Sequence, residues 1–314
     1  MRKSAWIEIL KNETPSYLEE DKPLAPLSTL GVGGSAELFI EPPDLESLRR
    51  LFELRAEWGF PIRFLGGGSN VVFADGRISG VVLSTRRLNS AWWSARPGDV
   101  MKNGVVADLQ AGHLLSLVVE RAAQEGLGGA EFALGIPGTV GGALAGNVGA
   151  GGHSLGELLE EVTSIEADGS LRRWARGDFT YSYRSFPLAD GARFLLSCKV
   201  LFLPKPRGEI EREMERFRSV RGIQPHGTRS AGCTFKNPPG DSAGRLLDEC
   251  GCKGMRVGGA VVSGHHANFI LNDGDASGKD VLELALRCRD EVYRRKKLEL
   301  HFEIKFLGFD AGAF

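Results

Sequence analysis

Residues 134–152 read LGIPGTVGGALAGNVGAGG and contain eight glycines. This composition predicts neither a stable helix nor an ordinary strand, because glycine and proline disfavour both. The apolar residues Ile136, Val140 and Leu144 are nevertheless spaced too regularly for a flexible linker. A backbone that presses against a flat ligand needs this composition, since glycine has no Cβ to block the approach. A long irregular loop is the alternative interpretation.

A second glycine run lies upstream, in LGGGSNVVFAD at residues 65–75. It follows a predicted strand at residues 61–65, and consecutive glycines there let backbone N–H groups converge on an anion. Ser69 and Asn70 add side-chain donors that suit a phosphate. The run is not a GxGxxG pattern opening a long helix, and the chain contains no GxxxxGK(S/T) stretch. Neither a Rossmann nor a P-loop site is therefore predicted. A glycine-rich hairpin is the alternative.

The composition is that of a globular protein without a nucleic-acid surface. The chain has 314 residues, of which 42% are hydrophobic and 25% charged, and its formal charge is −1. This length predicts two or three subdomains, and the balanced charge predicts no large basic face. We find neither a signal peptide nor an apolar run of the roughly 20 residues that a membrane helix needs. Five cysteines are few and odd in number, which favours a reducing cytoplasm over a disulfide framework.

Hydrophobic periodicity predicts a mixture of helices and strands without a regular βαβ repeat, so the predicted fold class is α+β. Asp44 is expected to cap the first helix, and Ser277 with Asp280 forms a capping box for the last one. Pro204 and Pro206 mark a boundary before the last third of the chain. The predicted helices are residues 44–58, 114–124, 208–221, 242–249 and 279–295, and the predicted strands are 61–65, 71–73, 81–83, 105–109, 161–165, 171–174, 193–203, 269–271 and 298–307.

Three side chains could supply a cation, a carboxylate and a proton donor. Arg184 lies in YSYRSFPL, Glu303 in LHFEIKFLG, and Cys233 in AGCTFKNP, among turn-forming residues rather than core hydrophobes. Each also has a plainer interpretation, since a charged strand residue usually faces solvent and a cysteine is often a small buried hydrophobe. Together they would form a catalytic constellation. The pair Cys250 and Cys252 lacks the spacing of structural zinc sites, so no metal is predicted.

Several longer stretches together resemble a known family. These stretches occur in the following order: LSTLGVGGSAELFIEP, LGGGSNVVFAD, GIPGTVGGALAGNVGA, YSYRSFP, AGCTFKNP, AGRLLDECGCKGMRVGGAVVSGHHANFILN and LHFEIKFLG. The resemblance covers nearly all of the chain from Thr29 to Gly308. The chain is similar to the UDP-N-acetylenolpyruvoylglucosamine reductases, the flavoenzymes that complete UDP-N-acetylmuramate in bacterial cell-wall synthesis. The resemblance implies a two-part FAD-binding domain of the vanillyl-alcohol-oxidase (PCMH) type, followed by a smaller α+β substrate-binding domain. The implied division is an N-terminal segment 1–23, FAD-binding subdomains 24–89 and 90–206, and a substrate domain 207–314.

The resemblance also implies the cofactors and the site residues. NADPH reduces FAD, a hydride passes to C3 of the enolpyruvyl group, and a protein acid protonates C2. Arg184 and Glu303 match the charged residues that support the intermediate, Cys233 matches the acid, and Lys236, Asn237 and His266 match substrate contacts. Non-covalent FAD would be held by residues of the two glycine runs, namely Gly66, Gly67, Gly68, Ser69, Asn70, Gly135, Ile136, Pro137, Gly138, Thr139, Gly141, Gly142, Ala143 and Asn147.

Two features depart from, or subdivide, the family pattern. The family's acid is usually serine, and the cysteine here is chemically reasonable because a thiol, with a pKa near 8.5, is a stronger acid than an aliphatic hydroxyl. No tyrosine lies between Tyr183 and Tyr293, which predicts the short-loop type without a tyrosine-bearing insertion. A monomer or weak oligomer in the cytoplasm is expected, without nucleic-acid or membrane partners. Another non-covalent FAD oxidoreductase of the same fold and a non-catalytic nucleotide-sugar-binding protein are the alternatives.

Overall fold

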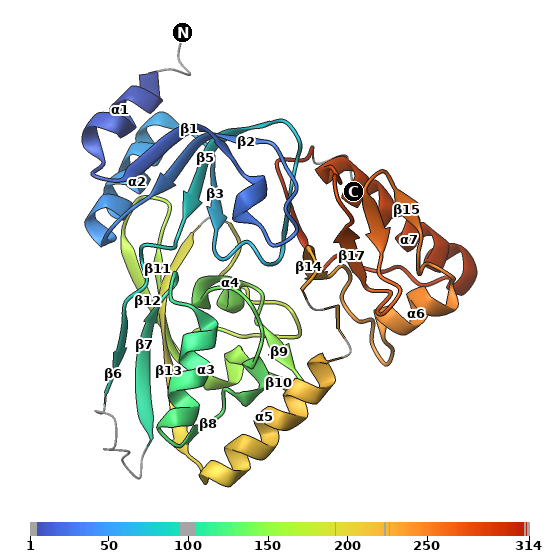
Figure 1. The fold of residues 1–314 in the computed structure, drawn as a ribbon. Coiled ribbons are helices and arrows are strands. Elements are labelled where there is room, and N and C mark those ends of the chain that lie inside the picture. Colours follow the sequence, from blue (N-terminus) through green and yellow to red (C-terminus); the bar gives the residue numbers. More distant parts are fainter. Residues whose placement is uncertain are drawn as a thin grey trace. The chain divides into compact units, whose positions relative to one another are not determined.

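The computed structural model describes residues 5–94, 104–191, 193–222, 224–225, 227–310 and 312 (Figure 1). The chain forms two compact units, each assembled from segments that are not consecutive in sequence. Unit 1 comprises residues 1–19, 38–67 and 80–221, and unit 2 comprises residues 20–37, 68–79 and 222–314. The predicted division into consecutive segments is a different description of the chain and stays a prediction.

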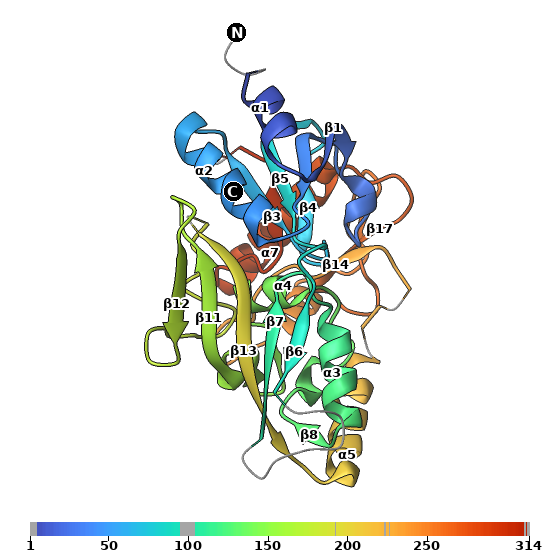
Figure 2. The same ribbon diagram turned by 90° about the vertical axis from the view of Figure 1, so that its left-hand side faces the viewer.

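A largely antiparallel sheet forms the centre of the larger part of unit 1. Its strands follow the order β12-β11-β13-β7-β6, as Figure 2 shows, and the short strand β8 pairs with the end of β13. Alternate residues of β7 are buried, because one face of the sheet covers a core that includes Phe132, Phe202 and Leu159. The strands are β6 Ala91–Trp93, β7 Val105–Gln110, β8 Leu127–Gly128, β11 Leu159–Ile165, β12 Leu171–Ala175 and β13 Phe194–Pro204.

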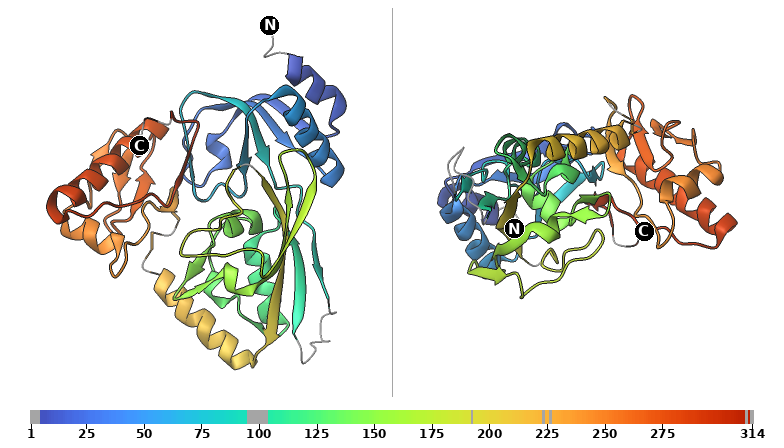
Figure 3. Two further views of the ribbon diagram at one scale, coloured as in Figure 1. Left: turned by 180° about the vertical axis from the view of Figure 1, so that it is seen from behind. Right: turned by 90° about the horizontal axis from the view of Figure 1, so that it is seen from below.

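The remaining elements of this part surround that core. Helix α3 buries Leu115, Val118 and Val119, as its apolar spacing predicts. Helix α5 follows β13 and is the long yellow helix of Figure 3. The elements are α3 Leu115–Gln124, α4 Val140–Ala145, α5 Arg207–Arg221, the short strands β9 Gly149–Ala150 and β10 His153–Ser154, and the 3-10 helices η2 Glu131–Ala133 and η3 Leu155–Leu158.

A second sheet has the order β1-β2-β5-β3, with β3 and β5 parallel. Helix α2 begins at its N-cap Asp44, whose carboxylate accepts a hydrogen bond from Ser47 N at 2.8 Å, as predicted. Its apolar face packs with α1 in a separate core that includes Phe52 and Phe194. The elements are α1 Ala5–Glu13, β1 Tyr17–Pro23, η1 Ala25–Leu27, β2 Ser35–Glu41, α2 Leu45–Trp58, β3 Ile62–Leu65 and β5 Arg77–Ser84.

Unit 2 contains an antiparallel sheet of order β14-β17-β16-β15 with two helices. Helix α7 starts at the predicted capping box, in which Ser277 and Asp280 exchange side-chain and backbone hydrogen bonds. Its buried residues pack with those of α6 in one core. The elements are β14 Ser230–Cys233, α6 Ala243–Glu249, β15 Arg256–Val257, β16 Ala260–Val262, β17 Phe269–Asn272 and α7 Gly278–Lys296.

A pair of strands joins distant parts of the sequence within unit 2. Strand β4 (Val71–Phe73) pairs in parallel with β18 (Lys305–Leu307). Just beyond β4, the Asp75 carboxylate accepts hydrogen bonds from Gly278 N at 2.6 Å and Lys279 N at 2.9 Å. A carboxylate at the first turn of a helix satisfies N–H groups that have no partner within the helix. Asp75 therefore anchors the start of α7 from 203 residues away.

Two sequence expectations were wrong. The predicted strand 298–307 is a strand only over Lys305–Leu307, while Phe302 forms an isolated bridge with Phe235. The glycine-rich stretch does contain a helix, α4, because burial of Val140, Ala143 and Leu144 outweighs the low helix propensity of its two glycines.

Candidate active site

The two glycine runs meet within unit 1. A Cβ on Gly66 would lie 2.6 Å from Thr139 Oγ1, and a Cβ on Gly67 would lie 2.7 Å from Gly138 Cα. Real Cβ atoms do not make such close contacts, so both positions require glycine. The two runs, which the family resemblance assigns to one cofactor, therefore pack against each other at these residues.

The arrangement around Thr139 fits a phosphate-bearing ligand. Its hydroxyl oxygen is buried and has no hydrogen-bond partner among the described residues. Buried polar groups are nearly always hydrogen-bonded, so such a group indicates a missing partner. Gly142 is exposed, and a Cβ there would contact only Thr139 Oγ1, at 3.7 Å. An unsatisfied hydroxyl beside an uncrowded glycine backbone suits the phosphate oxygens of a dinucleotide.

The rest of the second run is held by backbone hydrogen bonds. Val140 N donates to His113 O at 2.8 Å, and Gly141 N donates to Ala111 O at 2.8 Å. Ala143 is buried in the core, whereas Gly135 and Pro137 are exposed and Ile136 is half-buried. Asn147 is buried, and its amide group binds the backbone of Ser182 and Gly156. Cofactor contact by these residues stays a prediction.

Gly68, Ser69 and Asn70 belong to unit 2, because the boundary falls after Gly67. Gly68 has a φ of 71°, and a Cβ there would collide with the carbonyl oxygen of Leu27. Asn70 donates from Nδ2 to Glu303 O at 3.1 Å, and its own carbonyl accepts from Lys305 N at 3.0 Å. Asn70 therefore holds the segment that carries Glu303. Sequence reasoning missed this role, because an asparagine after a glycine run resembles a ligand contact equally well.

Arg184 lies on a tight turn of unit 1. Ser182 and Ser185 exchange backbone hydrogen bonds of 3.1 Å across the turn, and Arg184 has a left-handed φ of 52°. Its guanidinium donates from Nη1 to Gly149 O at 3.0 Å and lies 5.4 Å from the ring centre of Tyr183. Hydrogen bonds thus fix both the backbone turn at Arg184 and the tip of its side chain.

Cys233 and Glu303 come together in unit 2. Cys233 is half-buried at the end of β14, directly after a bulge at Gly232, whose φ is 78°. The next residue, Thr234, accepts hydrogen bonds at its carbonyl from Glu303 N at 2.9 Å and from Ile304 N at 3.4 Å. The structure therefore brings the predicted acid and the predicted carboxylate onto adjacent backbone segments.

Asn268 supports this pairing, and sequence reasoning did not single it out. It is buried, its Oδ1 accepts from Phe235 N at 2.9 Å, and its Nδ2 donates to Phe235 O at 2.8 Å. Its carbonyl also accepts from Thr234 N at 2.7 Å. A buried asparagine within the apolar stretch HANFIL was the available signal, since a buried amide needs several hydrogen-bond partners.

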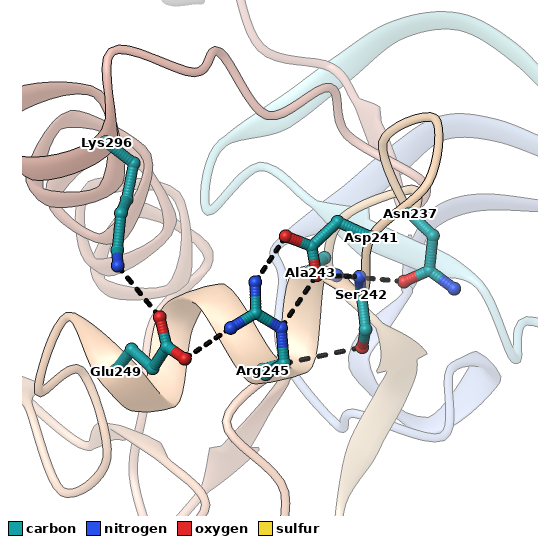
Figure 4. A network of polar contacts seen from close by, with 7 residues as sticks. All are labelled: Asn237, Asp241, Ser242, Ala243, Arg245, Glu249 and Lys296. Carbon is teal, nitrogen blue, oxygen red and sulfur yellow. Dashed lines mark hydrogen bonds and ion pairs between the residues drawn. The ribbon is translucent and has the colours of Figure 1, made fainter.

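The predicted substrate contacts lie on the same unit. Lys236 N donates to His301 O at 2.8 Å, and Lys236 is half-buried. Asn237 is exposed, and its Oδ1 accepts from Ala243 N at 3.0 Å at the start of α6 (Figure 4). The same view shows Arg245 on α6 paired with Asp241 and Glu249, and Glu249 paired with Lys296 of α7. These ion pairs connect α6, which Asn237 caps, to α7.

His266 is held beside α6 as a neutral ring. Burial lowers the pKa of its imidazole from 6.5, so the neutral form dominates at neutral pH. Nδ1 accepts from Asn268 N at 3.2 Å, which assigns the proton to Nε2. A Cβ on Gly244 would lie 2.7 Å from Cε1 of the ring, so α6 approaches His266 closely only because residue 244 is glycine.

Comparisons with known proteins show the family to which the chain belongs. Residues 36–175 match the FAD binding domain family, which defines a flavoprotein, and residues 224–307 match "UDP-N-acetylenolpyruvoylglucosamine reductase, C-terminal domain". Reductases of that name from Symbiobacterium thermophilum and Geobacter metallireducens are 38% and 39% identical, covering 94% and 95% of this chain and 93% and 97% of theirs. The crystal structure of the Thermus caldophilus enzyme aligns with a TM-score of 0.77 at 35% identity, covering 93% of this chain and 98% of that one. The chain belongs to the UDP-N-acetylenolpyruvoylglucosamine reductase family.

Several expectations are thereby confirmed. The fold is an FAD-binding domain of the PCMH type combined with the C-terminal domain of the family. The chain is an FAD-dependent oxidoreductase of peptidoglycan precursor synthesis, with NADPH as reductant. Separately from these expectations, no helix of the described residues is long and apolar enough to cross a membrane, and no three His, Cys, Asp or Glu side chains among them are grouped so as to hold a metal ion. The absence of a metal stays a prediction.

Proposed function

We propose that Arg184, Cys233 and Glu303 carry out the reduction of the enolpyruvyl group of UDP-N-acetylglucosamine-enolpyruvate to UDP-N-acetylmuramate. The observation that carries this proposal is the 2.9 Å hydrogen bond from Glu303 N to Thr234 O, next to Cys233. It supports a shared role for two residues that are far apart in the sequence. Arg184 belongs to unit 1, so its role rests on its motif and its fixed geometry.

The residues around Thr139 would hold the pyrophosphate of FAD. When bound, FAD accepts a hydride from NADPH and delivers it to C3 of the substrate. The Thr139 hydroxyl would donate to a phosphate oxygen, which would satisfy a group that lacks a partner in the described part of the chain. Gly66, Gly67 and Gly138 would place their backbones near that phosphate, and the uncrowded backbone of Gly142 leaves it room.

Cys233 would protonate C2 of the substrate. Hydride addition at C3 leaves negative charge shared between C2 and the carboxylate of the substrate, and the Sγ proton would neutralise it at C2. A thiol must therefore hold its proton until the hydride has moved. Cys233 is half-buried at the end of β14, so bound substrate would cover its thiol and exclude water from it while the hydride moves.

Arg184 would stabilise the charge that develops on the substrate. A cation held in a water-poor site stabilises a developing anion, and removal of one such group costs roughly 2.7–4 kcal/mol of barrier. Glu303 would act on the same intermediate from the segment beside Cys233. Both side chains would act on substrate alone, so the reduction of FAD by NADPH should not depend on them.

Replacement of Cys233 tests the proposal. In Cys233→Ala, we expect protonation at C2 to slow by about 10²–10⁴-fold, the range for loss of a positioned acid. Cys233→Ser should retain substantial activity, because it restores a hydroxyl that can donate a proton. Single-turnover reoxidation of reduced enzyme in deuterated buffer, with deuterium followed at C2, measures this step. An alanine variant with an unchanged rate of stereospecific C2 deuteration would show that the proton comes from another group.

Alkylation gives an independent test that requires no substitution. Cys198, Cys250, Cys252 and Cys288 are all at most 1% exposed, whereas Cys233 is half-buried. An alkylating reagent should therefore react first at Cys233 in the folded protein, and bound substrate should protect that thiol. Modification at Cys233 without loss of C2 protonation would argue against its role as the acid.

We also propose the finer features that family membership alone does not give. The stretch from Arg184 to Gln224 contains no tyrosine, which supports the short-loop type. Lys236 and His266 would then help to cover the substrate diphosphate. A monomer or weak oligomer working in the cytoplasm is consistent with the family, and sedimentation over a range of concentrations tests the oligomeric state.

A further inference from the structure

Asn147 is a buried polar residue whose two polar atoms reach different parts of unit 1. Its side chain follows α4, its exposed fraction is 3%, and its φ is 37°. Nδ2 donates to Ser182 O at 2.8 Å, and Oδ1 accepts from Gly156 N at 2.9 Å. Buried amides that satisfy backbone groups in this way fix the separation of the segments that they join.

The segment held through Nδ2 is the turn that carries Arg184. The carbonyl of Ser182 accepts two hydrogen bonds, one from Ser185 N at 3.1 Å and one from Asn147. Between these serines, Arg184 adopts its left-handed φ of 52°, a conformation that is unfavourable for a residue with a Cβ. A strained backbone of this kind persists only where surrounding contacts determine it.

The segment that follows Asn147 holds the guanidinium group of Arg184. Gly149 O, two residues beyond Asn147, accepts from Arg184 Nη1 at 3.0 Å. Gly149 is itself fixed by antiparallel pairing with Ser154. One short piece of chain, residues 147–149, therefore fixes both the backbone turn of Arg184 and the tip of its side chain.

We infer that Asn147 is a positioning residue for Arg184, and that its amide maintains the turn conformation which aims the guanidinium at the substrate. This inference rests on the proposed function, because it gives Asn147 a purpose only if Arg184 acts on the substrate. The competing interpretation is that Asn147 merely stabilises the glycine-rich segment after α4. That role would affect FAD binding and both half-reactions alike.

Two substitutions separate the groups of the amide. Asn147→Asp keeps an oxygen that can accept from Gly156 N but removes the donor to Ser182. Asn147→Gly removes the side chain and tolerates the positive φ. We expect each variant to slow reoxidation of reduced enzyme by substrate about 10- to 100-fold, since a misplacement of about 1 Å can cost 10²-fold. Reduction by NADPH and the absorbance of bound flavin should both stay within about twofold of the values of the unsubstituted protein, because the two polar atoms of Asn147 bind backbone groups. A loss of flavin absorbance would instead support the FAD contact that the family resemblance implies for Asn147, and would refute the positioning role.

A double-mutant cycle with Arg184→Ala distinguishes positioning from a general structural effect. If Asn147 acts through Arg184, Asn147→Asp should add less than about twofold in the Arg184→Ala background, because residues that act as a unit are not additive. The matched control is Ser170→Ala, which removes a side-chain hydrogen bond to Asp168 Oδ1 on the turn between β11 and β12 of unit 1. It should leave both half-reactions unchanged.

The outcomes separate this inference from the function on which it rests. An Arg184→Ala variant with normal reoxidation would refute the role of Arg184 itself. If Arg184→Ala is slow and Asn147→Asp is either normal or fully additive with it, the positioning role is refuted while the proposed function stands. If Asn147→Asp slows both half-reactions equally, the positioning role is also refuted. The glycine variant decides the question if the aspartate variant does not fold.

Discussion

The two glycine runs differ in how much space surrounds some of their glycines. At Gly66, Gly67 and Gly68 a Cβ would collide with atoms of the protein itself. In the second run, Gly141 and Gly149 are equally crowded, but at Gly142 and Gly146 the nearest atom to a Cβ would lie at 3.7 Å and 3.6 Å, which is ordinary contact. Abundant glycine therefore has two causes in one protein: dense packing of backbone on backbone, and space beside a backbone that a ligand can use.

The largest effect should follow a substitution at Gly68. Gly68→Val would place a branched side chain at a φ of 71° and against the carbonyl of Leu27. We expect the free energy of unfolding to fall by at least about 2 kcal/mol even without FAD, from strain and overpacking together. Urea unfolding of the FAD-free protein measures this loss. Gly177→Val is the control, because nothing lies within 4 Å of its Cβ. If Gly68→Val unfolds with a normal free energy but no longer binds FAD, Gly68 contacts the cofactor and is not needed for packing.

An intermediate effect is expected at Gly142, and it should be confined to the cofactor. In Gly142→Ala the added methyl group fits the protein, and helix α4 gains up to about 1 kcal/mol of propensity. FAD affinity should nevertheless fall at least about tenfold, equivalent to about 1.4 kcal/mol, if the methyl occupies the space of the ligand. Fluorescence titration of the FAD-free protein gives this affinity, with Gly146→Ala as the matched control. Unchanged affinity would remove Gly142 from the site.

The smallest effect is expected for Gly244→Ala, because the nearest atoms to the added Cβ belong to the ring of His266, a side chain that can rotate. Burial lowers the pKa of His266 below 6.5, so the unfolded chain binds that proton more readily. Stability should therefore decrease as the pH falls below about 6.5 and towards the folded-state pKa. His266→Gln should abolish this contribution, and Gly244→Ala should weaken it by displacing the ring. We expect Gly244→Ala to cost less than about 1 kcal/mol at neutral pH. Urea unfolding between pH 5 and 7.5 measures both, and an unchanged pH dependence in His266→Gln would assign it to other groups.

Helices were predictable from the sequence because their caps and apolar faces are local signals. Asp44 and the Ser277–Asp280 pair cap helices as the sequence predicted, whereas the cap at Ser242 was not predicted, although the helix that follows it was. Helix α4 was missed because its stability comes from burial against other segments and not from its own residues. The last strand was predicted too long because alternating residues from 298 onward resemble a strand, although only Lys305–Leu307 find a partner strand, in β4.

The candidate site was predictable as a set of residues but not as a set of contacts. Family motifs identified Cys233 and Glu303, whereas the hydrogen bond between Glu303 and Thr234 depends on how the chain folds. Asn70 and Asn147 show the limit most clearly. Both follow glycine runs, where an amide is expected to meet a ligand, yet their amides bind the backbones of Glu303 and Ser182.

The pairing of β4 with β18 has a consequence for biosynthesis. A ribosome makes β4 early, but its partner strand and the helix that Asp75 anchors emerge only near the end of translation. Residues 71–75 must wait with their backbone groups unpaired from these partners while most of the protein is made. The β4–β18 pair can therefore form only after residues 305–307 have been made, and a chain that ended before Lys305 would leave β4 without this partner strand.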